Sequence, residues 1–295
     1  MYKGINIAGK LADIGIYAFL TLFGLSILFP FYNMLLLSFA SYEHAVLATG
    51  VNMLPLSFTI DNYIRIFQDD QLVRSIWIAT RNVITGTAMA MVMTIFASYV
   101  LSRNRLPGRR FMFYFILFTM FFSAGLIPWY MVLLNLGFVN NIWVMTVPGI
   151  LSAFNMILMR NYFLSLPDSL EESAKLDGAG EFVIMFRIIV PLSGPIIATI
   201  ALFYAVGFWN QWFNAMIFLH DVRLTPLALL LRRMIIDNTI TFGEVVPAGF
   251  GAAQRLHGRS LEMAAVTVAT VPILCVYPFL QRYFTKGIML GAIKA

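Results

Sequence analysis

One charged segment stands between two long apolar runs: Glu171-Glu172-Ser173-Ala174-Lys175-Leu176-Asp177-Gly178-Ala179-Gly180-Glu181-Phe182. Lipid offers no partners to polar groups, so such a segment must lie in water or against a soluble protein. Its apolar residues recur at helical spacing on both sides of Gly178, and glycine accepts backbone angles that other residues resist. The segment therefore predicts two short amphipathic helices with a tight bend at Asp177-Gly178. An ordinary polar connecting loop is the alternative.

The composition indicates an integral membrane protein. Hydrophobic residues make up 60% of the sequence and charged residues 12%, whereas soluble domains carry about 25% charged residues. The net charge of +6 favours basic cytoplasmic loops over nucleic-acid binding. The single Cys275 excludes an intramolecular disulfide. The sequence shows no His, Cys and carboxylate cluster at metal-ligand spacing, so we expect no metal site, no cofactor site and no catalytic residues.

Six apolar runs predict an all-α, polytopic protein with six transmembrane helices. The predicted spans are residues 14–39, 76–101, 111–134, 142–163, 191–219 and 260–281. Residues 1–70 are predicted to hold the N-terminal tail, the first span and an extracytoplasmic segment. Residues 71–295 are predicted to form the core, with a polar loop at 164–190 and a C-terminal tail.

The arginines predict the orientation. Six spans place both termini on one side of the membrane. The short loop 102–110 carries four arginines, and short basic loops stay in the cytoplasm. Because this loop lies on the side of the termini, both termini and the polar loop 164–190 are predicted to be cytoplasmic.

The polar loop resembles the signature loop of permease subunits of ATP-binding-cassette (ABC) importers. That signature reads Glu-Ala-Ala, then a glycine, and later an apolar residue followed by proline. Its parts here are Glu172-Ser173-Ala174, Asp177-Gly178-Ala179 and Val190-Pro191, with Ser173 in place of the first alanine. The resemblance runs from about residue 58 to the C-terminus. Residues 125–130 and 286–294 make the chain similar to the carbohydrate branch, and within it to permeases for complex oligosaccharides such as alginate.

The resemblance implies the fold, the location and the partners. It implies a type I ABC importer permease fold in the bacterial inner membrane. The implied partners are a second, homologous permease, two cytoplasmic ATPase subunits, an extracytoplasmic solute-binding protein and an oligosaccharide. The sequence contains no G-x-x-x-x-G-K-[ST] motif, so ATP and Mg²⁺ are expected on the ATPase subunits.

The polar loop is then the coupling loop that docks on the ATPase. Its apolar face, with Leu170, Ala174, Leu176 and Phe182, is expected to fill a groove as an amphipathic helix does, while Glu172 meets a basic residue. The residues that the resemblance assigns to coupling are Glu172, Ala174, Asp177, Gly178, Ala179, Phe182 and Pro191.

The fifth predicted span contains the best candidates for a sugar pathway. Asn210 and Asn214 are predicted to lie one helical turn apart on one face, and polar residues at membrane depth usually face a cavity or the bundle interior. Their amides suit sugar hydroxyls, and either Trp209 or Trp212 suits the apolar face of a sugar ring. Asn155, in the fourth span, is a further candidate. The alternative is interhelical hydrogen bonding.

Other function classes remain as alternatives. An integral-membrane enzyme needs a convergent acid–base or nucleophilic set, and a secondary transporter often carries inverted repeats and buried ionisable groups. The sequence shows neither pattern. The outer loop 220–259 carries five arginines. It is either a solvated loop that touches a partner, or a basic surface for an acidic binding protein or an anionic oligosaccharide.

Overall fold

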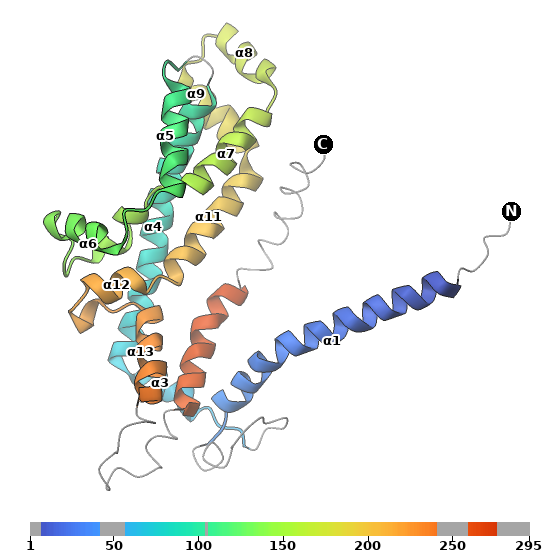
Figure 1. Cartoon of the computed structure of the whole chain (residues 1–295), viewed down its shortest axis with the longest axis vertical. Helices are drawn as coiled ribbons and strands as arrows, with labels where there is room; N and C mark the ends of the chain where they lie inside the picture. The colour runs from blue at the N-terminus through green and yellow to red at the C-terminus, as the bar shows by residue number, and fades with distance from the viewer. Residues whose placement is uncertain (1–6, 42–56, 104–105, 241–258, 276–295) are drawn as a thin grey trace. The chain divides into compact units, whose positions relative to one another are not determined.

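The computed structural model describes residues 7–41, 57–103, 106–240 and 259–275 (Figure 1). These residues form helices and no strand, which confirms the predicted all-α fold. The helices are α1 Ile7–Ser38, α3 Asp61–Gln68, α4 Asp70–Ser102, α5 Arg109–Phe121, α6 Leu126–Asn135, α7 Ala153–Ser165, α8 Asp168–Leu176, α9 Glu181–Ile184, α10 Val190–Leu192, α11 Gly194–Trp209, α12 Phe213–Phe218, α13 Leu227–Ile240 and a helix over 259–275. Short 3₁₀ turns η1 Ile142–Met145, η2 Val147–Gly149 and η4 Val222–Leu224 and a π turn, η3 Met185–Ile189, complete the described elements.

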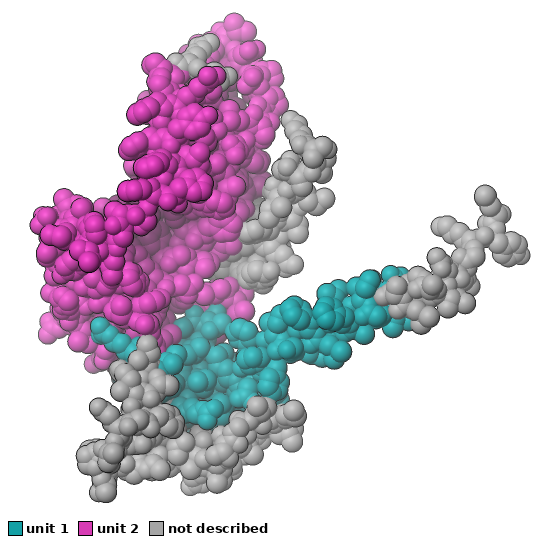
Figure 2. Space-filling view, viewed as in Figure 1, with its two compact units in different colours: residues 1–69, 233–270 teal, residues 70–232, 271–295 magenta. Residues whose placement is uncertain are grey.

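The chain divides into two compact units, which Figure 2 colours separately. Unit 1 comprises Met1–Asp69 and Arg233–Thr270, and unit 2 comprises Asp70–Arg232 and Val271–Ala295. The predicted division into residues 1–70 and 71–295 stays a prediction.

Unit 1 contains a long apolar helix and a short amphipathic one. In α1, an 18-residue apolar window within Asp13–Ser38 contains no buried residue, as expected for a helix that faces lipid, whereas Leu37 and Ser38 at the end of the helix are buried. The end of α1 is joined to α3, where the Asn62 amide donates to the Ser38 carbonyl at 3.0 Å and the hydroxyls of Ser38 and Tyr63 lie 2.7 Å apart. These contacts hold the start of α3 against the end of α1.

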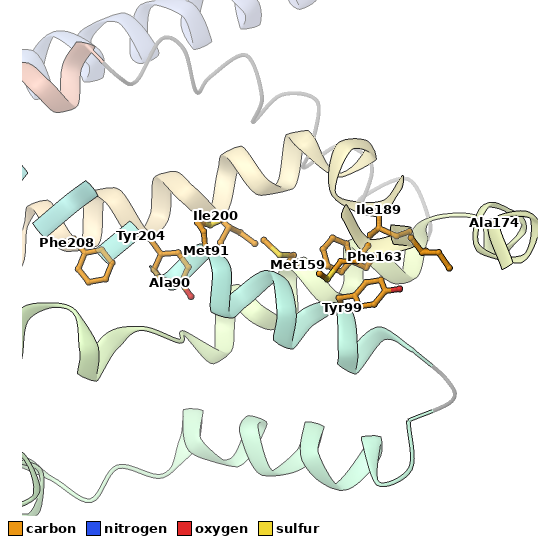
Figure 3. Close-up of a cluster of buried hydrophobic side chains, with 12 residues drawn as sticks. Ala90, Met91, Tyr99, Met159, Phe163, Ala174, Ile189, Ile200, Tyr204 and Phe208 are labelled. Atoms are coloured by element: carbon orange, nitrogen blue, oxygen red, sulfur yellow. The ribbon is translucent and has the colours of Figure 1, made fainter. Parts of the chain in front are cut away.

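Unit 2 is built around α4, α7 and α11. The 33 residues of α4 rise about 50 Å at 1.5 Å per residue, more than the roughly 30 Å of the bilayer core. Figure 3 shows buried side chains following one another along the seam between these helices, from Phe208 to Ile189. Ala174 of α8 lies at the far end of this row. The seam therefore connects the polar loop to the interior of unit 2.

Close packing and a polar contact hold the seam together. A Cβ added to Gly86 of α4 would lie 2.8 Å from the ring of Phe208 of α11, so only a glycine allows this approach. Further along, the hydroxyls of Thr94 and Tyr204 lie 2.7 Å apart, and the Ser152 amide donates to the same Tyr204 oxygen at 3.0 Å. A small residue and paired polar groups are typical of helix contacts inside membranes.

A second cluster surrounds the other end of unit 2. Leu133, Val144, Met145, Ala215, Phe218 and Leu229 are buried together there, from α6, η1, α12 and α13. Asn140, at φ +52°, ties this region to the end of α12, because its side-chain oxygen accepts hydrogen bonds from the amides of His220 at 2.7 Å and Asp221 at 3.1 Å. Asparagine tolerates this left-handed backbone.

The spans differ in detail from the predicted ones. Three described helical stretches are long and apolar enough to cross a membrane, namely Asp13–Ser38, Asp70–Ser102 and Gly194–Phe218. The third predicted span is broken, with α5 and α6 meeting at 116°, and the fourth bends by 44° between η2 and α7. With each bent pair as one span, the described count is five. The sixth predicted span lies partly outside the described residues, so the count of six stays a prediction.

The break in the third span has a local cause. Hydropathy reads residues 111–134 as one apolar run, but α5 ends at Phe121 and α6 begins at Leu126. Gly125 holds φ +84°, a backbone angle at which a right-handed helix cannot continue. Pro128 lies in the first turn of α6, where its missing N–H costs nothing. The run is therefore two helices.

Candidate functional site

The polar loop forms the two helices that the sequence predicts, α8 and α9. After α8, the Ala179 amide donates to the Ala174 carbonyl at 2.9 Å, and the Gly178 amide donates to the Lys175 carbonyl at 3.0 Å. This pair of hydrogen bonds is the Schellman motif at a helix C-terminus. In that motif the residue directly after the C-cap adopts the left-handed backbone conformation. Gly178 meets that need with φ +82°. The predicted bend is confirmed.

The loop has an inner and an outer side. Leu176 is 89% exposed and Phe182 69% exposed, so two large apolar side chains point away from the unit. Glu172 and Asp177 are exposed beside them. Ala174 is buried in the core cluster, so it anchors α8 from inside and does not lie on the outer apolar face expected for it.

Charged side chains bind the inner side of the loop to the end of α4. Arg103 forms an ion pair with Glu171, and Lys175 pairs with Glu171. Lys175 also lies 3.2 Å from a carboxylate oxygen of Glu181. The Tyr99 hydroxyl donates to Glu181 at 2.7 Å, and the Arg103 guanidinium lies 4.3 Å from the centroid of the Tyr99 ring. We call these five residues the loop anchor.

The loop anchor stabilises the ionised form of Glu181. The hydrogen bond from Tyr99 lowers the pKa of the Glu181 carboxyl most, partial burial raises it, and Lys175 and Arg103 lower it further. The net shift is downward, so Glu181 stays charged at neutral pH. Tyr99 and Arg103 were not singled out as site residues from the sequence, because they lie far from the loop along the chain. The clustering of Glu and Lys in the loop was the available signal.

Pro191 lies where the loop re-enters the helices. The π turn Met185–Ile189 precedes it and α10 contains it at its first turn. Proline has no N–H, so the Arg187 carbonyl, four residues earlier, has no α-helical donor at this position. A wider turn accommodates that gap, and π turns recur at functional sites. Ala179 also packs against the core cluster, so the loop joins α11 through a fixed, irregular helix.

The predicted pathway residues do not lie on one uninterrupted helix. α11 ends at Trp209 and α12 begins at Phe213, so the predicted helical turn between Asn210 and Asn214 is wrong. Asn210 caps α11 instead, with its side-chain amide donating to the Val206 carbonyl at 3.0 Å. Asn214 is half-buried in α12. Helical spacing could not reveal the break, which the polar residues Asn210 and Gln211 fill.

The remaining pathway candidates lie apart from one another along the chain. Trp209 is half-buried at the end of α11. The Trp212 ring packs edge-on against Phe213 with centroids 5.6 Å apart. Asn155 is buried in the first turn of α7, where Ser152 accepts a hydrogen bond from its backbone amide at 3.4 Å.

Other polar side chains adjoin this break, and sequence reasoning missed them. Asn82 of α4 is 3% exposed, and its amide donates to the Phe208 carbonyl and to the Gln211 side chain, both at 3.4 Å. Next to it, the Arg81 guanidinium lies 5.3 Å from the centre of the Trp143 ring. Asn82 thus supplies a hydrogen-bond donor to the Phe208 carbonyl, near the end of α11.

Comparison with known proteins identifies the family. Residues 83–290 match the family described as binding-protein-dependent transport system inner membrane component. The chain is 39% identical over 285 residues to a polygalacturonan/rhamnogalacturonan transport system permease protein of Bacillus subtilis (strain 168), covering 97% of this chain and 99% of the relative. An arabinooligosaccharides transport system permease protein of Halalkalibacterium halodurans is 27% identical over 277 residues, covering 90% of this chain and 91% of that one.

A solved structure agrees with this assignment. A chain of a bacterial ABC transporter involved in the import of the acidic polysaccharide alginate matches with a TM-score of 0.85 and 30% identity, covering 96% of this chain and 99% of that chain. This match supports the permease fold, and the likeness extends over nearly the whole chain. The chain therefore belongs to the family of inner membrane components of binding-protein-dependent transport systems, the permeases of ABC importers.

Proposed function

We propose that this chain is the membrane-spanning permease subunit of an ATP-driven importer of acidic oligosaccharides. One observation carries the substrate class. The 39% identical relative is named for polygalacturonan and rhamnogalacturonan, and the 30% identical structure imports the acidic polysaccharide alginate. Both substrates are built with uronic acids. A neutral oligosaccharide is the second candidate, because a more distant relative is named for arabinooligosaccharides.

The proposed partners follow from the family and from the chain's own limits. A binding-protein-dependent component needs an extracytoplasmic solute-binding protein. The sequence has no phosphate-binding P-loop, so we assign ATP and Mg²⁺ to two cytoplasmic ATPase subunits. A second, homologous permease completes the proposed assembly, with both termini of this chain in the cytoplasm.

The coupling loop is proposed to work through its two sides. Leu176 and Phe182 offer exposed apolar surface to a groove on the ATPase, and Glu172 offers a charge beside them. Asp177 and Gly178 set the bend that presents both helices together. On the inner side, the loop anchor holds the loop to α4, so a displacement of the loop moves the spans with it.

The sugar pathway is assigned to the residues around the break between α11 and α12. Asn214 and Trp212 are proposed to line it, while Asn210 shapes the end of α11. Trp209 and Asn155 remain candidates. Asparagine side chains at membrane depth that are not fully used by the protein suit sugar hydroxyls or water.

Reconstitution tests the function directly. The chain is assembled in liposomes with its candidate second permease, ATPase and binding protein, and uptake of a short oligogalacturonate is measured with and without ATP. We expect uptake that requires ATP and the binding protein. Uptake without the ATPase supports a secondary transporter instead, and a chemically altered product points to a membrane enzyme. Either result contradicts the proposal.

A further inference from the structure

Two arginines of unit 2 lie against tryptophan rings and have no carboxylate partner among the residues that the structure describes. Arg81 of α4 lies 5.3 Å from the centre of the Trp143 ring, and Arg232 of α13 lies 3.9 Å from the centre of the Trp212 ring. The ion pairs among the described residues use Arg103 and Lys175 only. Arg232 additionally contacts the Met216 sulfur at 3.0 Å. Both guanidinium groups therefore keep N–H donors available.

The depth of Arg81 makes this arrangement informative. The second apolar run begins at residue 76, so Arg81 lies about 8 Å inside it at the helical rise of 1.5 Å per residue. A charged side chain at membrane depth is costly, and such residues usually face a water-filled cavity or a substrate path. Arg81 is half-buried. Its guanidinium lies against the neutral ring of Trp143. No carboxylate within the described part of the chain pairs with this charge, which favours a function in binding.

The surroundings of Arg81 suit an anion. A recess of about 10 Å³ is lined by Arg81, Asn82, Thr85, Ile142, Trp143 and Thr146. That volume accommodates about one water-sized group, which is the size of a carboxylate oxygen and far smaller than a sugar ring. The Trp143 ring lies within cation–π range of the guanidinium, and the N–H groups of an arginine suit a carboxylate oxygen.

The second pair lies along the same line of contacts. Asn82, next to Arg81, donates to Gln211, and Gln211 precedes Trp212, over which Arg232 is stacked. The two arginine–tryptophan pairs therefore flank one amide contact at the break between α11 and α12. Cations beside aromatic faces and amides match a polymer that repeats a carboxylate, hydroxyls and an apolar ring face.

We propose that Arg81 on Trp143 and Arg232 on Trp212 bind the carboxylates of a uronic acid oligosaccharide on its way through this permease. The inference rests on the proposed function and extends it to named residues. It makes these arginines specificity determinants: they select acidic over neutral sugars.

The test compares one oligomer in two charge states. Uptake per assembled complex is measured in proteoliposomes for a short oligogalacturonate and for the same oligomer with its carboxyl groups methyl-esterified. The variants are Arg81→Gln and Arg232→Gln. Arg81→Lys keeps the charge but loses the paired hydrogen bonds. Arg223→Gln is the matched control, since Arg223 is an exposed arginine of η4 in the same unit.

We expect Arg81→Gln and Arg232→Gln to lower uptake of the acidic oligomer by about tenfold or more, the effect of one lost charge-assisted hydrogen bond. Uptake of the esterified oligomer should change less than about twofold, and Arg81→Lys should fall between wild type and Arg81→Gln. The control should match wild type with both sugars. Equal losses for both oligomers, or none for either, overturn the inference. Wild-type complex that transports neither oligomer contradicts the proposed function itself.

Discussion

Gly178 offers a quantitative test of the coupling loop. Its φ of +82° lies in the left-handed region, which costs an L-residue with a side chain about 1–2 kcal/mol. A Cβ added there has no atom within 4 Å, so Gly178→Ala introduces backbone strain and no collision. We expect it to destabilise the docked bend by that amount, which lowers the population of the bend about 5- to 30-fold.

The assay is binding-protein-stimulated ATPase activity of the reconstituted complex, with uptake measured on the same liposomes. Gly178→Ala should reduce both per assembled complex, while complex yield stays near wild type because the strain is local. Gly178→Asn should reduce them less, since asparagine tolerates the left-handed region. Gly180→Ala is the control, because Gly180 has φ −73° and open space at its Cβ. If Gly178→Ala behaves as Gly180→Ala does, the loop does not depend on this bend and the reasoning fails.

Three further changes test other parts of the structure. Tyr99→Phe should weaken the loop anchor by about 0.5–1.5 kcal/mol. Hydrogen exchange of α8, expressed as protection relative to the intrinsic rate at each pH, should detect it. In the wild type this protection should fall only as pH drops below roughly 4.3 and through the lowered pKa of Glu181; a loss of protection already at pH 6 would contradict this. Gly86→Leu should cost at least about 1–3 kcal/mol by forcing Phe208 aside, seen as a lower Tm of the complex; an unchanged Tm would show that α4 and α11 have room. Asn214→Ala should slow uptake per complex and leave Tm near wild type; a loss of Tm in proportion to uptake would mark Asn214 as structural.

The sequence predicts local features of the coupling loop because their causes are local. Helical spacing of apolar residues and a glycine at the turn are sufficient to predict α8, α9 and the bend at Gly178. Burial is a property of the whole unit, so the inward position of Ala174 depends on the seam that α8 meets. The loop anchor likewise needs Tyr99 and Arg103, which the fold brings to the loop from the end of α4.

The positions of the pathway residues could not be predicted from the sequence because they depend on the break between α11 and α12. Hydropathy averages over many residues, so it identifies the span that includes Gly194–Phe218 but not the local break where α11 ends at Trp209 and α12 begins at Phe213. Once the helix stops, its last carbonyls need donors. Asn82 supplies one from α4, and no pattern within either segment alone indicates that contact. The same averaging conceals the 116° angle between α5 and α6.

The two ends of unit 2 are connected by rigid packing, and this gives the proposed transport cycle a physical route. The loop anchor fixes the coupling loop to the end of α4, and the π turn before Pro191 leads directly into α11. Along the seam, Gly86 against Phe208 and Thr94 against Tyr204 leave α4 and α11 little freedom to slide. Packed interiors shift between discrete arrangements rather than deforming gradually. We therefore propose that a movement of the loop reaches the break between α11 and α12 as a displacement of whole helices, where Arg81 and Arg232 are proposed to hold the sugar.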